Sequence, residues 1–263
     1  MKIISVLFLL ATAVATCHGQ DSVENGLEYQ ILPLRLKSGS GGQHIQGITC
    51  SSWRLAVETH NIINWKTVPQ ECEGYIGNYI LGDQYRGDSK AVNREAYFYV
   101  RDLNLTKDGK NIWVFDIDET SLSNLPYYAE NGFGSTPYND TAFNEWVNLG
   151  MAPVLPETKK LYKKLLSFGI KIVFLTGRPE SQRAITTKNL NDAGYYQWEK
   201  LILKDKEQYK GKTAVTYKST ERKKLEQQGY RIIGNIGDQW SDILGYSTGD
   251  RTFKLPDPLY YIA

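Results

Sequence analysis

The chain has 263 residues, of which 41% are hydrophobic and 23% are charged, and its formal net charge is +2. This composition is typical of a globular protein with room for one large α/β domain, or for a core domain with a smaller helical partner. A charge so close to neutral argues against nucleic acid or an anionic membrane surface as a partner.

Residues 1–19 have the pattern of a cleaved secretory signal, with Lys2 followed by an apolar stretch and small residues near Gly19. We expect cleavage near Gly19 and export through the secretory pathway, to the vacuole or the extracellular space. A buried N-terminal helix is the alternative. The later sequence has no apolar stretch long enough to span a bilayer, so we expect no membrane anchor.

The cysteines and sequons agree with export. Cys17 would leave with the signal, and Cys50 and Cys72 would remain as a pair. Two lone cysteines in an oxidising compartment usually form a disulfide, although two free buried thiols remain the alternative. N-glycosylation sequons begin at Asn104 and Asn139, and their occupancy stays open.

The mature chain divides into three expected parts. Residues 20–47 contain a Gly/Ser cluster with little periodicity and predict an extended arm. Residues 48–105 show helical patterns rich in aromatic residues and predict a small helical N-terminal subdomain. Residues 106–263 form the predicted core domain.

From residue 110 onwards, predicted strands and helices alternate along the chain. Strands are predicted at 112–118, 170–177, 200–204, 230–238 and 251–255, and helices at 141–150, 156–169, 179–194 and 220–229. This alternation predicts an α/β fold with a parallel sheet and helices on both faces, and we expect the last strand at a sheet edge.

Polar residues gather where the predicted strands end. In chain order they are Asp116, Asp118, Thr176, Gly177, Lys218, Asp238 and Asp242, with Lys218 just before the helix predicted at 220–229. Because parallel strands bring their carboxyl ends to one edge of a sheet, we expect these residues to meet in one crevice.

Crowded carboxylates repel one another unless a cation lies among them. Oxygen ligands without histidine or cysteine favour Mg²⁺ over zinc, and such sites leave coordination positions for water and a substrate phosphate. The candidate ligands are Asp116, Asp118, Asp238 and Asp242, of which Asp118 would use its backbone carbonyl oxygen. Thr176 and the Gly177 N–H would bind phosphate oxygens, and Lys218 would add positive charge.

Two aspartates at positions i and i+2 can divide the chemistry of phosphoryl transfer. Asp116 would attack phosphorus and form an aspartyl-phosphate. Asp118 would protonate the leaving oxygen and later accept a proton from water. We interpret Glu119 as structural, and Arg178 as either a phosphate contact or a structural ion pair.

The segments "VFDIDET", "FLTGR", "YKS" and "GDQWSD", in this order, resemble the four motifs of haloacid dehalogenase (HAD)-like phosphatases. Their flanks are similar to plant acid phosphatases of the class B type, the family that includes the vegetative storage proteins, over roughly residues 40 to 263. The resemblance implies a Rossmann-like core, Mg²⁺ dependence and hydrolysis of small phosphomonoesters at acidic pH. It implies the site roles given above for Asp116, Asp118, Thr176, Lys218 and Asp238, and it suggests a homodimer.

Two functions of different classes remain open. The first is a secreted or vacuolar Mg²⁺-dependent acid phosphatase, and the second is a storage glycoprotein whose hydrolysis is weak or incidental. Storage members of the family can lack the first aspartate, whereas this chain retains Asp116. Phosphotransfer to an acceptor alcohol would use the same residues and differ only in what attacks the intermediate.

Overall fold

The computed structural model describes residues 44, 45 and 47–263. The expected signal at 1–19 and nearly all of the expected arm at 20–47 lie outside the described residues. The first described segments are two short antiparallel strands, β1 (His44–Ile45) and β2 (Ile48–Thr49).

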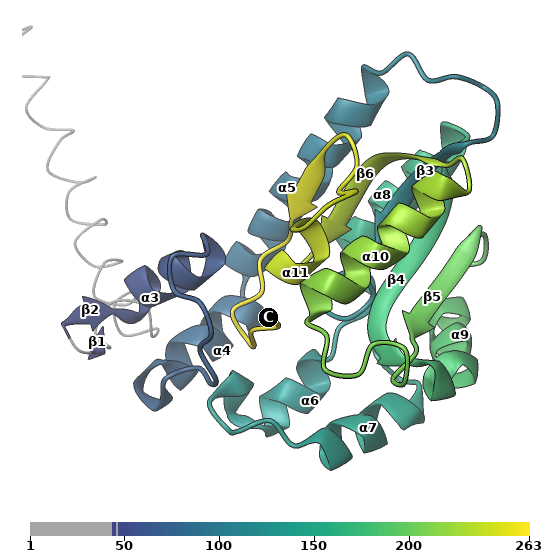
Figure 1. Ribbon diagram of the computed structural model, residues 1–263. Helices are drawn as coiled ribbons and strands as arrows, with labels where there is room; N and C mark the ends of the chain where they lie inside the picture. Colours follow the sequence, from purple (N-terminus) through teal and green to yellow (C-terminus); the bar gives the residue numbers. More distant parts are fainter. Residues whose placement is uncertain (1–43, 46) are drawn as a thin grey trace, which may run out of the picture.

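A five-stranded parallel sheet forms the centre of the molecule (Figure 1). Its strands, in spatial order, are β5 (Lys200–Lys204), β4 (Lys171–Pro179), β3 (Asn111–Phe115), β6 (Arg231–Gly237) and β7 (Thr252–Lys254). The α/β class predicted from the sequence is therefore confirmed, with β7 at an edge as expected. Strand β3 is the central strand, so the residues that follow it reach the middle of the sheet's carboxyl edge.

Helices cover both faces of the sheet. Successive side chains of a strand point to opposite sides, and in the central strand the side chains on both sides are apolar and need to be covered. In β3, Trp113 and Phe115 pack with α5 (Asp83–Arg101), α8 (Pro156–Ser167) and α9 (Arg183–Asp192). Ile112 and Val114 pack on the other side with α10 (Ala214–Gln227), which lies in front of the sheet in Figure 1. All five residues of β3 are buried, which explains the continuous apolar run from Ile112 to Phe115.

The N-terminal helices have an apolar cluster of their own. Helices α3 (Cys50–Glu58) and α4 (Glu73–Leu81) pack there with Tyr127 and Tyr128 of α6 (Leu125–Glu130) and with Leu259 near the C-terminus. The helical character expected for this part of the chain is present. Helix α5 contributes Tyr85 to this cluster, and its later residues Ala96 and Val100 pack on the main sheet.

A disulfide joins Cys50 at the start of α3 to Cys72, which precedes α4. The bond closes a loop with a sequence separation of 22 residues. Both cysteines are fully buried. The predicted pairing is therefore confirmed, and the alternative of two free thiols is wrong.

Some elements differ from the sequence-based expectation. Helix α10 begins at Ala214, so Lys218 lies inside the helix and not before it. The helix starts early because Thr213 caps it: the Thr213 hydroxyl oxygen accepts a hydrogen bond from the Thr216 N–H at 3.2 Å. Helix α6 has no counterpart among the predicted elements, although Pro126 lies in its first turn, where proline is favoured.

The remaining described elements connect these layers. They are the single-turn 3-10 helices at Gln70–Cys72, Gly132–Gly134 and Glu180–Gln182, helix α7 (Asp140–Leu149) and helix α11 (Trp240–Ile243). Within the described ranges, no helix has both the length and the apolar character needed to cross a bilayer.

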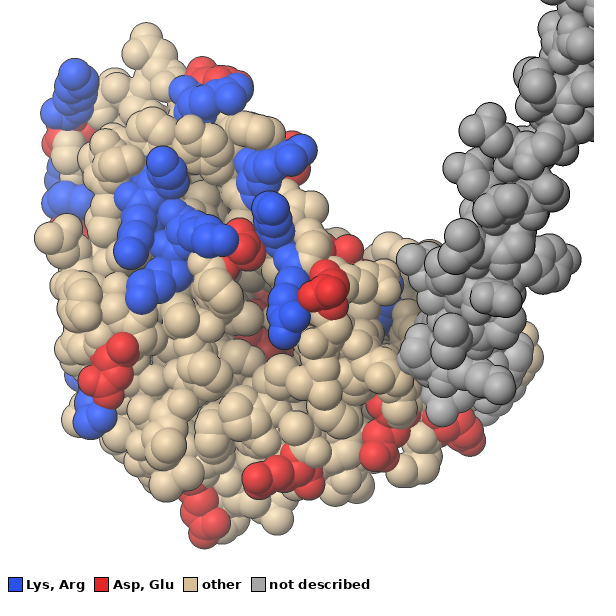
Figure 2. All heavy atoms as spheres, turned by 180° about the vertical axis from the view of Figure 1, so that it is seen from behind, with Lys and Arg blue, Asp and Glu red and all other residues tan. Residues whose placement is uncertain are grey.

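Figure 2 shows that Lys and Arg gather in the upper part of one face and Asp and Glu along its lower edge, so this face carries both signs of charge.

Candidate active site

Three aspartates that are distant in sequence or lie on different elements meet at the carboxyl edge of the sheet. Asp116 follows β3, Asp238 follows the adjacent strand β6, and Asp242 belongs to the short helix α11. One carboxylate oxygen of each lies within 4.8 Å of the others, and all three side chains are buried. The convergence expected from the strand ends is present for these residues.

The structure also explains why Asp242 reaches this position. A Cβ atom on Gly237 would lie 2.2 Å from the Asp242 Oδ2 atom, so only glycine leaves room for this carboxylate. The Gln239 N–H donates to the same oxygen at 2.9 Å and holds the side chain at the first turn of α11. The segment "GDQWSD" therefore brings the carboxylates of Asp238 and Asp242 into the same cluster.

Lys218 of α10 faces two of the three carboxylates. Its Nζ atom lies 2.6 Å from Asp116 Oδ1 and also pairs with Asp242. Burial by itself lowers the pKa of Lys218, but the carboxylates of Asp116 and Asp242 outweigh burial and raise it above its usual range. Burial raises the pKa of Asp116 and the Asp242 carboxylate raises it further, while Lys218 lowers it.

The charges of this cluster fit a divalent cation. Three carboxylates and one ammonium group leave a net charge of −2 when all are ionised. The donors in the cluster are carboxylate oxygens, which Mg²⁺ prefers over nitrogen or sulfur ligands. A cation at this point would relieve the mutual repulsion that raises the pKa of Asp116.

Asp118 lies apart from the three-carboxylate cluster and forms an ion pair with Arg178. The Arg178 Nη2 atom lies 2.7 Å from Asp118 Oδ1, and Nε lies 3.1 Å from both carboxylate oxygens. Burial favours the neutral acid, but Arg178 outweighs burial and lowers the pKa of Asp118 below its usual range. Of the two roles left open for Arg178, the described structure shows the ion pair.

Thr176 and Gly177 lie beside this pair on β4. Thr176 is fully buried, and its hydroxyl oxygen accepts from the Arg178 N–H at 3.1 Å and donates weakly to Asp118 Oδ2 at 3.4 Å. Gly177 is exposed. Strand β4 extends to Pro179, so these residues lie inside the strand, whereas the predicted strand ended at residue 177.

Other residues at the site were not singled out by sequence reasoning. Thr120 donates to Asp238 Oδ1 at 3.0 Å, and Asn124 donates to Asp118 Oδ1 at 2.9 Å. The proximity of both to "DID" along the chain is the signal that could have identified them. Tyr260, which donates to Asp238 Oδ2 at 3.1 Å, is 22 residues away in sequence and carries no such signal.

Glu119 holds the loop that follows β3. Its carboxylate accepts hydrogen bonds from the backbone and side-chain amides of Asn124, and its backbone has a positive φ of 51°. Burial raises the pKa of Glu119 to about 8, with further contributions from the Asp118 and Asp238 carboxylates. These contacts agree with the structural role interpreted from the sequence.

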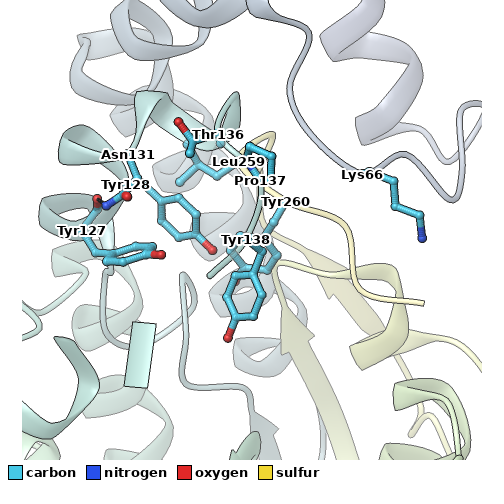
Figure 3. Close-up of a pocket in the computed structure, with 10 residues that line it drawn as sticks. Lys66, Tyr127, Tyr128, Asn131, Thr136, Pro137, Tyr138, Leu259 and Tyr260 are labelled. Carbon is cyan, nitrogen blue, oxygen red and sulfur yellow. Dashed lines mark hydrogen bonds between the residues drawn. The ribbon is translucent and has the colours of Figure 1, made fainter. Parts of the chain in front are cut away.

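A small cavity lies close to these residues. Figure 3 shows the rings of Tyr127, Tyr128, Tyr138 and Tyr260 around it, and its volume is about 30 Å³. Residues 124–150 therefore contribute aromatic side chains beside the site.

The two sequon asparagines are both exposed. Asn139 caps α7, and its Oδ1 atom accepts from the Ala142 N–H at 3.1 Å. Glycan occupancy at Asn104 and Asn139 stays a prediction.

Comparison with known proteins supports this assignment of the fold and motifs. A family model described as "HAD superfamily, subfamily IIIB (Acid phosphatase)" matches residues 36–263. The chain is 50% identical over 265 residues to the stem 28 kDa glycoprotein of Glycine max, and the match covers 100% of both chains. It is 43% identical over 263 residues to acid phosphatase 1 of Solanum lycopersicum, again with 100% of both chains covered.

Vegetative storage protein 1 of Arabidopsis thaliana is 41% identical over 271 residues, with 100% of this chain and 99% of that chain covered. Among solved structures, the class C acid phosphatase from Bacillus anthracis matches with a TM-score of 0.57 and 22% identity, covering 72% of this chain and 85% of that chain. The structural match shows a shared fold. The chain therefore belongs to the acid phosphatases of the HAD superfamily, subfamily IIIB.

Proposed function

We propose that this protein is an Mg²⁺-dependent acid phosphatase that hydrolyses small phosphomonoesters through an aspartyl-phosphate on Asp116, in the vacuole or the extracellular space. The observation that carries the proposal is the position of Asp116, buried within reach of Lys218 and of two further carboxylates, Asp238 and Asp242. Membership of an acid phosphatase family supports it.

In the first step, a carboxylate oxygen of Asp116 forms a bond to phosphorus as the ester P–O bond breaks. Asp118 gives a proton to the leaving alcohol oxygen. In the second step, Asp118 takes a proton from a water molecule that attacks phosphorus, and the Asp116 carboxylate is released. Arg178 holds Asp118, two residues from the nucleophile, as the ionised carboxylate, so the first step requires this ion pair to open and Asp118 to take up a proton before it protonates the leaving oxygen.

Thr176 and the exposed Gly177 backbone would bind the equatorial phosphate oxygens, and the Lys218 ammonium would offset their charge. Asp116, Asp238 and Asp242 would hold Mg²⁺, with the backbone carbonyl of Asp118 as a further ligand. When bound, Mg²⁺ supplies positive charge that stabilises the transferring phosphoryl group.

The substitution Asp116→Asn tests the proposal, because it removes the nucleophile and changes little volume. We expect the purified variant to have no turnover of p-nitrophenyl phosphate with Mg²⁺ at roughly pH 5 to 6, while its thermal unfolding shows an intact fold. Asp192→Asn, an exposed position on α9 paired with Lys188, is the matched control and should keep full turnover. Wild-type turnover by Asp116→Asn would contradict the covalent mechanism.

A storage glycoprotein with incidental hydrolysis is the second candidate. It is favoured by the names of the relatives in Glycine max and Arabidopsis thaliana. The measured kcat of the wild-type protein separates the two candidates, because a storage role alone requires no efficient turnover. On the basis of the family resemblance, we also propose that the protein is a homodimer. Analytical sedimentation of the purified protein tests this oligomeric state.

A further inference from the structure

The last residues of the chain return to the edge of the sheet that carries the candidate site. After β7, the Leu255 N–H donates to the Gly237 carbonyl at 2.9 Å, directly before Asp238. The chain then continues to Ala263, whose carbonyl accepts from the Ala214 N–H at 2.8 Å at the start of α10. We call residues 256–263 the C-terminal segment.

The carboxylate of Asp238 has three neutral hydrogen-bond donors. Thr120 donates to Oδ1 at 3.0 Å, whereas the Tyr260 hydroxyl and the Gln239 side-chain amide donate to Oδ2 at 3.1 and 3.0 Å. A carboxylate offers about four lone-pair directions, two on each oxygen. Tyr260 and Gln239 therefore use both lone pairs of Oδ2, whereas Thr120 uses one lone pair of Oδ1 and leaves the other free.

We propose that Tyr260 is a positioning residue for the proposed metal site. With Gln239 it occupies Asp238 Oδ2, so that Oδ1 is the oxygen presented to the cation. This inference rests on the proposed function, because it assumes that Asp238 ligates Mg²⁺.

Gln239 joins the C-terminal segment to Asp238 from two sides. Its Nε2 atom donates both to Asp238 Oδ2 and, at 2.8 Å, to Asp257 Oδ2. Its Oε1 atom accepts from the Ile262 N–H at 3.0 Å. The amide cannot rotate without losing contacts to the C-terminal segment, and this fixes its direction toward Asp238.

Packing holds Tyr260 in place. Its ring stacks on Tyr128 of α6 at a centroid distance of 5.5 Å and an interplanar angle of 20°, and both residues are drawn in Figure 3. The neighbouring Leu259 carbonyl lies so close to Gly134 that a Cβ atom there would be 2.0 Å from its oxygen. The Tyr260 ring and the preceding Leu259 backbone are therefore held by contacts that need no ligand.

Tyr260→Phe tests the proposal, because phenylalanine keeps the ring on Tyr128 and removes only the hydroxyl, which lies 3.1 Å from Asp238 Oδ2 and 3.4 Å from Glu119 Oε2. Titration calorimetry of the full-length protein with Mg²⁺ alone should show about tenfold weaker binding in this variant. Tyr261→Phe is the matched control. The Tyr261 ring packs on His60 and Trp65, and within the described residues its hydroxyl has no hydrogen-bond partner. Its Mg²⁺ affinity should equal that of the wild type.

A second variant, Gln239→Met, removes another donor to the same oxygen and should also weaken Mg²⁺ binding. Asp238→Asn serves as the reference for loss of the site itself. If the wild-type protein binds no Mg²⁺, the proposed metal site is wrong. If the wild type binds and Asp238→Asn does not, but Tyr260→Phe binds as tightly as the wild type, the metal site stands and the positioning role is wrong. A lower melting temperature of metal-free Tyr260→Phe with unchanged Mg²⁺ affinity would also overturn it.

Discussion

Lys218 is the residue on which the charge balance of the site depends, because its ammonium group is shared by two buried carboxylates. Removing one partner of a buried ion pair is costly, since the other charges stay in a medium that solvates them poorly. We therefore expect the Lys218→Met substitution to affect both stability and the proposed hydrolysis.

For Lys218→Met we expect the free energy of unfolding at neutral pH to fall by about 3 kcal/mol in EDTA, measured by urea unfolding. Hydrolysis of p-nitrophenyl phosphate should fall at least about 100-fold, because a charge that stabilises the transferring phosphoryl group is lost. Lys188→Met is the control: this exposed lysine pairs with Asp192, and its loss should cost less than about 1 kcal/mol. Equal losses in both variants would contradict the assigned role of Lys218.

The loop between α5 and β3 is an element whose stability should depend on pH. Asp108 in this loop accepts from Arg231 of β6 at 2.9 Å and from the Lys110 N–H at 3.1 Å. Its hydrogen bonds to Arg231 are the main cause that lowers the pKa of Asp108 to about 2. A carboxyl whose pKa is lower in the folded state stabilises the fold above its unfolded-state pKa, and this contribution disappears as pH falls through the folded-state value.

Asp108→Asn should therefore lower stability at neutral pH, and its difference from the wild type should shrink as pH falls from about 4 toward 2. Urea unfolding at several pH values measures this difference, and NMR titration of Asp108 measures the pKa itself. A difference that is constant across this range would mean that the ion pair with Arg231 is not its source.

The disulfide acts on the N-terminal helical elements. It closes a loop with a sequence separation of 22 residues, so it restricts the unfolded chain and should contribute about 3 kcal/mol. The Cys50→Ala, Cys72→Ala double variant should unfold at a lower temperature than the oxidised wild type. Reducing agent should lower the wild-type melting temperature and leave the double variant unchanged. A wild type that is insensitive to reductant would contradict this contribution.

Sequence reasoning predicted the elements that have a strong local pattern. The strand at 200–204 has the predicted bounds, because "KLILK" is short and clearly delimited. The start of α10 was missed since Lys218 was interpreted as a loop residue, whereas the Thr213 cap starts the helix earlier. The approach of Asp116 to Asp238 was predictable because parallel strands share one edge. The contact of Tyr260 was not, because it depends on the path of the last residues over the finished fold.

For the whole molecule, metal removal is the simplest test of the carboxylate cluster. EDTA should abolish hydrolysis of p-nitrophenyl phosphate, and excess Mg²⁺ should restore it. The reason is that the substrate is negatively charged, so it can bind beside the three carboxylates only when a cation offsets their charge. Activity that does not respond to chelation would exclude a metal at Asp116, Asp238 and Asp242. Melting temperatures with and without Mg²⁺ give a second readout of binding to the folded state.

The contacts of the C-terminal segment have a consequence for proteolysis. The Tyr260 hydroxyl donates to Asp238, and the Ile262 N–H donates to Gln239, which itself donates to Asp238. Cleavage of the chain between β7 and Tyr260 would therefore release donors from Asp238, while every acid of the carboxylate cluster stays in the remaining fold.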